Sequence, residues 1–357
     1  MAYWRKIIGL VFAIGVLLLT ACGPDSFLDR REIYTDDGVT AKIRLDVDWL
    51  SSFGSKPSGM TVMAFPGKGK RTESHTNSVD SETLSLTKGT WRILLFNLTP
   101  DEFGSLAFTG LDDYDSLRVN LTKMPRQSSR AWDDGASYRC EPEAVGIATD
   151  TVEVTKRMVD ESYELRANGG DTVYVVKETA RPVTTTLNIR VKVKGLANAI
   201  GLQGSISGMA DGYMLMQHHA VTSGNAHFLD DWKFALADGS KSDGYATTTI
   251  KTFGLPFKDG EVLSLRDSTA NVLTLYFELR DGKTTRTFKL NAGHLFHYVR
   301  GSGSDRAYTS ERTQVLDLVV DGDNIPQLPD VENNRSASGF DAHVDPWDDG
   351  GNTDVHF

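Results

Sequence analysis

The chain has 357 residues, of which 39% are hydrophobic and 24% charged, a composition typical of a globular protein with room for two domains. Its formal net charge is −10. Because it has no block of basic residues, its composition argues against a nucleic-acid partner. The two cysteines, Cys22 and Cys140, are too few for a disulfide framework. We expect Cys140 to be a small buried side chain rather than a catalytic thiol.

The N-terminal residues have the pattern of a secretion signal. Two basic residues precede an apolar run, residues 7–19, which is too short to span a membrane. The run ends in Leu19-Thr20-Ala21-Cys22, which resembles the lipobox of bacterial lipoproteins. We therefore expect residues 1–21 to be a lipoprotein signal peptide. Cys22 would carry the lipid, such as palmitate, that attaches the mature chain to a membrane. An ordinary secretory signal with an incidental cysteine is the alternative.

The two halves of the remaining chain open with the same pattern. After a polar stretch that we expect to be a lipidated tether, residues 22–39, apolar and polar residues alternate as in a strand with one buried face. The pattern returns directly after Arg181-Pro182, which we expect to break the chain. The apolar positions are Ala41, Ile43, Leu45, Val47 and Trp49 in the first strand, and Leu187, Ile189, Val191 and Val193 in the second.

The other apolar runs are also short and are separated by turn residues. We expect strands over residues 60–65, 83–86, 90–97, 144–155, 162–166, 172–177, 203–209, 213–216, 245–253, 272–279, 284–290, 294–299 and 314–320. Asp281-Gly282 has the sequence of a tight hairpin turn. No stretch shows sustained helical periodicity. The sequence therefore predicts an all-β fold with two β-sandwich domains, residues 40–180 and 181–325, and a C-terminal tail, residues 326–357.

No group of residues has the spacing of a catalytic or metal site. His218 and His219 are adjacent, so they would point to opposite faces of a strand, and no carboxylate accompanies them at a suitable spacing. The acidic residues of the tail lack the spacing of a calcium-binding loop. We therefore expect no enzyme activity, no metal and no cofactor. Trp132, Trp232 and Trp347 lie in polar surroundings and are candidates for a surface that stacks on sugars.

Several segments of the chain resemble a known family of bacterial proteins. They are Cys22 after the lipobox, Arg30-Arg31-Glu32, Val47-Asp48-Trp49, residues 59–66, residues 89–97, Glu141-Pro142-Glu143, Arg181-Pro182, residues 206–210 and residues 339–345. On these residues the chain resembles the fimbrillin-associated lipoproteins of Bacteroides-type bacteria, a family that includes minor-fimbria anchor proteins. Within that family it is most similar to a lipoprotein domain of unknown function.

The resemblance implies a fold and a role. Members of the family have two transthyretin-like or immunoglobulin-like β-sandwiches behind a lipid, lie at the outer membrane and bind a pilus subunit. We thus expect an outer-membrane lipoprotein, exposed at the cell surface, that acts as an anchor or accessory subunit of a fimbria. A surface glycan-binding lipoprotein is the alternative function.

Strand addition is the way in which we expect the chain to bind a fimbrial subunit. The edges of a sandwich present unpaired backbone groups, to which a partner can add a strand. In the tail, Phe340, Ala342 and Val344 would share one face of a strand. This segment either completes a sheet of the chain itself or pairs with a neighbouring subunit.

Overall fold

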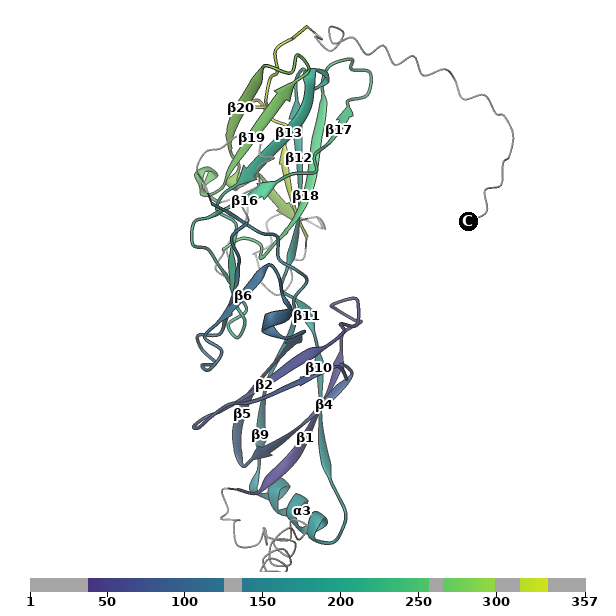
Figure 1. Ribbon diagram of the computed structural model, residues 1–357, viewed down its shortest axis with the longest axis vertical. Coiled ribbons are helices and arrows are strands. Elements are labelled where there is room, and N and C mark those ends of the chain that lie inside the picture. The colour runs from purple at the N-terminus through teal and green to yellow at the C-terminus, as the bar shows by residue number, and fades with distance from the viewer. Residues whose placement is uncertain (1–37, 125–136, 257–265, 299–314, 333–357) are drawn as a thin grey trace, which may run out of the picture. The chain divides into compact units, whose positions relative to one another are not determined.

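The structure is a computed structural model that describes residues 38–124, 137–256, 266–298 and 315–332 (Figure 1). The chain divides into two compact units. Unit 1 contains the described residues up to Gly104, Phe108–Leu117 and Ala144–Pro182, and unit 2 contains Ser105–Ala107, Arg118–Glu143 and the described residues from Val183 onward. The stretch 118–143, which we expected within the first domain, thus belongs to unit 2. In the part of the chain that the structure describes, no helix has the length and apolar character needed to cross a membrane.

Unit 1 is a sandwich of two sheets. The smaller sheet has the strand order β10-β1-β4, and the larger sheet has the order β11-β9-β5-β2-β3. The strands are β1 (Thr40–Asp48), β2 (Met60–Pro66), β3 (Thr72–Thr76), β4 (Ser81–Thr87), β5 (Gly89–Asn97), β9 (Gly146–Val154), β10 (Val173–Thr179) and β11 (Arg181–Pro182).

The core of unit 1 lies between its two sheets because the strands bury alternate residues. Ile43 and Leu45 of β1 have no exposed surface, while the polar residues beside them lie on the outer face. Trp49 follows β1 and is buried as well, and its Nε1 donates to the carbonyl of Val79 at 2.8 Å. The alternation expected for residues 41–49 is therefore confirmed.

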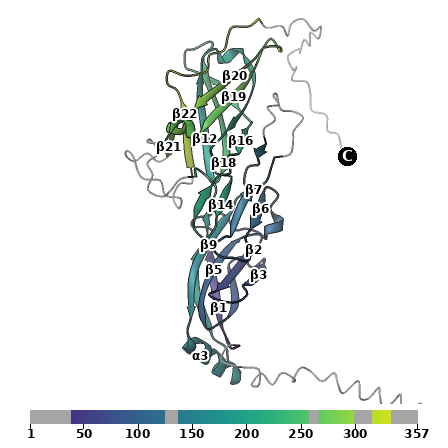
Figure 2. The ribbon, with the colours of Figure 1, turned by 90° about the vertical axis from the view of Figure 1, so that its left-hand side faces the viewer.

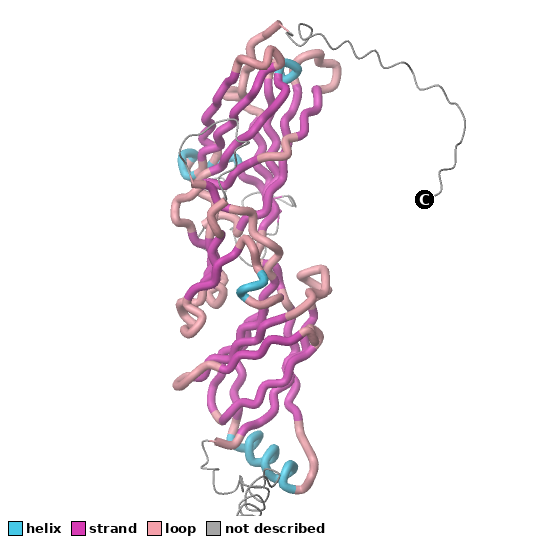
Figure 3. Tube along the Cα trace, viewed as in Figure 1, coloured by secondary structure: helices cyan, strands magenta, loops and turns pink. Residues whose placement is uncertain are grey.

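The connection between β9 and β10 corrects one prediction. Residues 162–166, which we expected to form a strand, lie in the helix α3 (Lys156–Ala167; Figure 3). Thr155 caps this helix, since its side chain accepts a hydrogen bond from the N–H of Met158. Most residues of α3 are good helix formers, but only Val159 and Ser162 are buried. Its apolar stripe is therefore too narrow to show as helical periodicity in the sequence.

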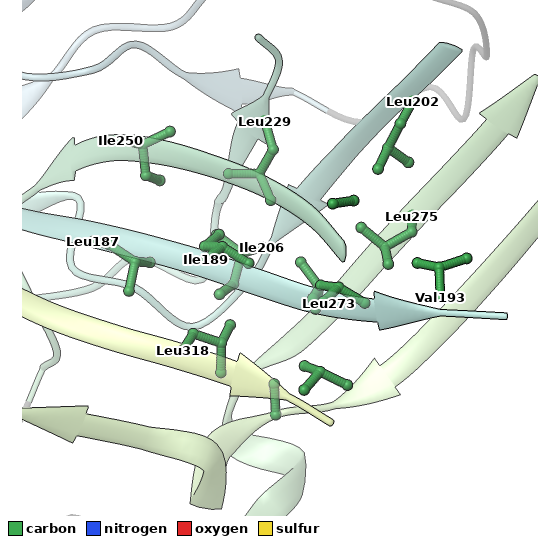
Figure 4. Packing of buried hydrophobic residues seen from close by; sticks show 14 of the residues in the cluster. Leu187, Ile189, Val193, Leu202, Ile206, Leu229, Ile250, Leu273, Leu275 and Leu318 are labelled. Carbon is green, nitrogen blue, oxygen red and sulfur yellow. The ribbon is translucent and has the colours of Figure 1, made fainter. Parts of the chain in front are cut away.

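Unit 2 is built around a second sandwich, with the strand orders β17-β18-β12-β22-β21 and β20-β19-β13-β16-β8. The strands are β8 (Tyr138–Arg139), β12 (Thr185–Val193), β13 (Ala199–Ile206), β16 (Ala226–Leu229), β17 (Lys233–Leu236), β18 (Gly244–Thr252), β19 (Val272–Leu279), β20 (Thr285–Asn291), β21 (Phe296–Tyr298) and β22 (Val315–Val320). Leu187 and Ile189 of β12 pack in one cluster with Leu318 of β22 (Figure 4). The turn at Asp281-Gly282 joins β19 to β20, as the sequence predicts.

A further sheet, with the order β15-β14-β7-β6, is formed by two segments that are distant in the sequence. Its strands are β6 (Leu106–Thr109), β7 (Arg118–Leu121), β14 (Gly212–Met214) and β15 (His219–Val221). In the sequence, β7 lies between β5 and β9, and β14 lies between β13 and β16. The two strands pair antiparallel. Short 3-10 helices are η1 (Pro100–Glu102), η2 (Leu196–Asn198), η4 (Ser268–Ala270) and η5 (Gly293–Leu295).

The two sandwiches share one connectivity. In each, the opening strand lies between an antiparallel neighbour and a later strand of the unit, which is parallel to it: β4-β1-β10 in unit 1 and β18-β12-β22 in unit 2. In the opposite sheets, the order β3-β2-β5-β9 corresponds to β16-β13-β19-β20. The predicted fold class, all-β with two sandwich domains, is confirmed.

Candidate functional site

The strand β10, which ends the smaller sheet of unit 1, is a sheet edge with no further strand beside it among the described residues. β10 pairs in parallel with β1, from Val173 opposite Lys42 to Thr179 opposite Asp48. No other strand of the described chain pairs with β10. The backbone N–H and C=O groups on its outer side are therefore open to a further strand.

Unit 2 shows what occupies the same position when the sheet is closed. Its last strand, β22, pairs with β12 as β10 pairs with β1. A further strand, β21, then pairs antiparallel with β22, with Phe296 opposite Leu318 (Figure 2). Phe296 is 1% exposed, so β21 closes the core of unit 2 at this edge. β10 has no counterpart of β21 among the described residues.

The side chains of β10 show the consequence of this missing strand. Val173 and Val175, on the outer face, are 38% and 47% exposed. Tyr174 and Val176, on the inner face, pack against the core of unit 1 but are only partly buried. The inner side chains of β22, by contrast, are almost completely buried. The described residues thus leave the core of unit 1 partly uncovered along β10.

Two carboxyl groups meet in this opening. Glu178 is the third inner residue of β10, opposite Val47 of β1, and Asp150 lies on the facing strand β9. Burial raises the pKa of Glu178 to about 7, and the charge of Asp150 and a hydrogen bond with it add to the effect. Oε1 of Glu178 is buried without a hydrogen-bond partner among the described residues. We call this opening, formed by Tyr174, Val176 and Glu178 of β10 and Asp150 of β9, the β9–β10 seam.

The helix α3 fixes the other end of the seam. The hydroxyl of Tyr174 donates to Oε2 of Glu161 at 2.7 Å and lies 3.4 Å from the carbonyl of Met158. The guanidinium of Arg166, at the end of the helix, donates to the carbonyl of Thr40 where β1 begins. These bonds hold α3 against both β1 and β10, so the seam is bounded by helix at one end and by the acidic pair at the other.

Most of the residues that the sequence analysis singled out cannot be placed relative to the β9–β10 seam. Cys22, Trp132, Phe340, Ala342, Val344 and Trp347 are outside the described residues. The free edge itself was predicted only as a strand over residues 172–177. Glu178 could have indicated the sheet edge from the sequence, because it continues the inward-facing row of this strand with a charged residue. An inward-pointing charge is a common feature of edge strands.

The other candidates from the sequence analysis, Trp232, Cys140, His218 and His219, lie among the described residues. Trp232 is half-buried and packs against the core of unit 2. Cys140 is a free cysteine of intermediate exposure, not the fully buried residue that we expected. In the ranges that the structure describes, His218 and His219 belong to no group of three or more potential metal ligands.

The fold defines a two-domain, all-β protein whose two sandwiches share one connectivity. Among the described residues, the sandwich of unit 1 has no strand that corresponds to β21. The chain belongs to the family described as "Domain of unknown function (DUF5119)", whose model matches residues 29–230. No curated protein matches the chain.

Solved structures of several bacterial proteins are similar to the chain. A "putative adhesin" from Bacteroides ovatus ATCC 8483 matches with a TM-score of 0.56 and 15% sequence identity, over 87% of this chain and 98% of that chain. The fimbrial anchor protein Mfa2 from Porphyromonas gingivalis matches with a TM-score of 0.45 and 13% identity, over 78% of this chain and 90% of that one. A fimbrial assembly protein from Parabacteroides distasonis ATCC 8503 matches with a TM-score of 0.30 and 11% identity, over 71% of this chain and 87% of that one. None of the three is named as an enzyme.

Proposed function

We propose that the chain is an anchor or accessory subunit of a fimbria, held at the outer membrane by a lipid on Cys22, and that it binds a pilus subunit by strand addition. The observation that carries the proposal is the free edge of β10, at the position that β21 fills in unit 2. The fold shared with a "putative adhesin" and the resemblance to fimbrillin-associated lipoproteins support a role in adhesion at the cell surface.

Strand addition would use groups that β10 already presents. Backbone hydrogen bonds to its outer side would supply affinity without depending on sequence. The added strand would also flank Val173 and Val175 on one side, and apolar surface that it covers contributes roughly 25 cal/mol per Å². Its inner side chains would fill the space beside Tyr174 and Val176, as Phe296 does in unit 2.

Replacing Val175 by lysine is expected to weaken binding of a purified fimbrial subunit of the same bacterium by at least about tenfold, because an edge lysine opposes the addition of a strand. Affinity measured by biolayer interferometry checks this. The matched control is Leu236→Lys, since Leu236 is 52% exposed on β17, an edge strand of unit 2. Equal affinities for the two variants would contradict the assignment to β10.

The same assay tests the tail. The chain up to Glu332 is tied to unit 2, because the N–H of Leu328 donates to the carbonyl of Lys194 at 2.9 Å and Nε of Arg280 donates to the carbonyl of Val331 at 3.0 Å. Only residues 333–357 should therefore be removed. We expect this truncation to keep the subunit bound through β10. Loss of binding with unchanged stability would instead place the added strand, Phe340 to Val344, in the partner.

Replacing Cys22 by alanine is expected to move the protein from the membrane fraction to the soluble fraction, or to leave an uncleaved precursor. The cysteine sulfur is the proposed attachment point, and several acyl chains are needed for durable anchoring. Fractionation followed by mass spectrometry of the N-terminal peptide checks the result. The control is Cys140→Ala, which removes the other cysteine and should leave the distribution unchanged. A Cys22 variant that still sediments with membranes like the wild type would disprove lipid anchoring.

A further inference from the structure

The β9–β10 seam has a charge requirement as well as a shape. A strand that pairs antiparallel with β10, as β21 pairs with β22, places alternate side chains over the inner row Tyr174, Val176 and Glu178. Apolar side chains suit the first two positions, which border the core. At the third position an apolar side chain would cover Glu178 and the second carboxyl, Asp150, without supplying a positive charge, and burial of a negative charge without a counter-charge is unfavourable.

We propose that the seam accepts an antiparallel strand that carries lysine or arginine at the position facing Glu178 and Asp150, and apolar side chains at the other inner positions. The inference rests on the proposed function and adds to it the chemistry of the partner's strand. A basic side chain at this position would pair with the two carboxylates. It would also donate to Oε1 of Glu178, the buried acceptor that lacks a partner among the described residues.

Among the described residues, no positively charged group shifts the pKa of Glu178, so we expect the partner's strand to supply the cation. β1 places Val47 opposite Glu178, and its charged residues, Lys42, Arg44, Asp46 and Asp48, all lie on the outer face, where Lys42 pairs with Asp171 and Arg44 with Asp46. α3 places Glu161 at the other end of the seam, where it accepts a hydrogen bond from Tyr174. Within the described chain, Asp150 of β9 is the one charged group that shifts the pKa of Glu178. The pair is thus acidic on both strands that form the seam.

Protonation of Glu178 makes the binding depend on pH. Because its pKa is about 7 in the free protein, this carboxyl is partly protonated at neutral pH. A cation beside it lowers the pKa, so a basic strand releases a proton on binding and binds more tightly as the pH rises through about 7. A strand with glutamine at that position buries the carboxyl without pairing it and raises the pKa. Such a strand binds more weakly as the pH rises, so the two slopes have opposite signs.

The experiment uses capped, fluorescent peptides of alternating valine and threonine. The peptides of each pair differ at one inner position, which is lysine in one and glutamine in the other. Further pairs have this position moved along the peptide, so that each register of pairing is covered. Fluorescence anisotropy with the mature protein gives the affinities. The lysine peptide is expected to bind about fivefold to tenfold more tightly at about pH 8 than at about pH 6, and the glutamine peptide is expected to show the reverse slope. Glu178→Gln should remove both slopes and the preference for lysine. This variant should still bind the glutamine peptide, which shows that its seam is intact.

The outcomes separate this inference from the proposed function. Equal, pH-independent binding of both peptides that is blocked by Val175→Lys would overturn the charge requirement and leave strand addition at β10 in place. Lysine-selective binding that Val175→Lys does not weaken would place the peptide elsewhere and overturn the inference. If no peptide binds in any register, neither the charge requirement nor β10 as an acceptor of strands survives.

Discussion

Replacing Leu45 or Ile189 by aspartate is expected to unfold one unit and to leave the other folded. Leu45 lies in the middle of β1 in unit 1, Ile189 lies in the middle of β12 in unit 2, and their exposed fractions are 0% and 1%. An unpaired carboxylate at either position removes core packing and is cut off from water. We expect a cost of roughly 5 kcal/mol, which is comparable to the total stability of a domain.

Hydrogen exchange measured peptide by peptide in the full chain distinguishes the two units. Leu45→Asp should abolish protection in β1, β4 and β10 and keep it in β12, β18 and β22, and Ile189→Asp should do the opposite. The matched controls are Ser85→Asp on β4 and Thr287→Asp on β20, which place the same charge on exposed positions of the same units. A Leu45 or Ile189 variant with wild-type protection would show that the alternation does not define the core of that unit.

The strands that open each unit could be predicted because burial on one face leaves a period of two in the sequence. Leu45 and Ile189 both lie in such alternations, and the structure buries both. The hairpin turn at Asp281-Gly282 was predictable for a local reason as well: Gly282 has a φ of 67°, which glycine adopts without strain. Features set by local chemistry and by one-sided burial were thus accessible from the sequence.

The features that the sequence did not reveal depend on contacts between distant segments. Arg118–Leu121 pairs with Gly212–Met214, and the strand Tyr138–Arg139 pairs with Ala226–Leu229, so residues 118–143 join unit 2 through partners much later in the chain. No periodicity records such pairing. The free edge was hidden in the same way, because β10 and β22 both look like apolar strands in the sequence. Among the described residues, β22 pairs with a closing strand, β21, and β10 does not.

Asp211 is the residue that ties this distant pairing together. It lies between β13 and β14 and is 2% exposed. Its backbone N–H donates to the carbonyl of Val221, and its carbonyl accepts from the N–H of Leu121 at 2.8 Å, so it joins β15 to β7. Its carboxylate accepts from the backbone N–H and hydroxyl of Ser223 and from Nδ2 of Asn225 at 2.8 Å.

Arg139 of β8 supplies the cation for this buried carboxylate, with its Nε 3.4 Å from Oδ2 of Asp211. Burial alone would raise the pKa of Asp211, but the hydrogen bonds from Ser223 and Asn225 and the charge of Arg139 outweigh it, and the pKa is lowered. The neighbouring His227 is not the cation. Burial lowers its pKa to about 4, against the charge of Asp211, so the ring is neutral at pH 7.

Replacing Asp211 by alanine is expected to destabilise unit 2 by about 3 kcal/mol, because it leaves the partly buried Arg139 without its carboxylate and removes the buried acceptor of the Ser223 and Asn225 hydrogen bonds. Urea unfolding at pH 7 measures the loss, and hydrogen exchange should show it first in β7 and β8. The control Asp238→Ala removes an exposed carboxylate of the same unit and should change stability by less than about 0.5 kcal/mol.

In the wild type, the contribution of Asp211 to stability is present above the usual aspartate pKa and is lost as the pH falls through the lowered pKa of the folded state. The gap between wild type and Asp211→Ala should therefore narrow in acid, and a gap that stayed constant down to about pH 2 would show that the carboxylate is not the source of the stability.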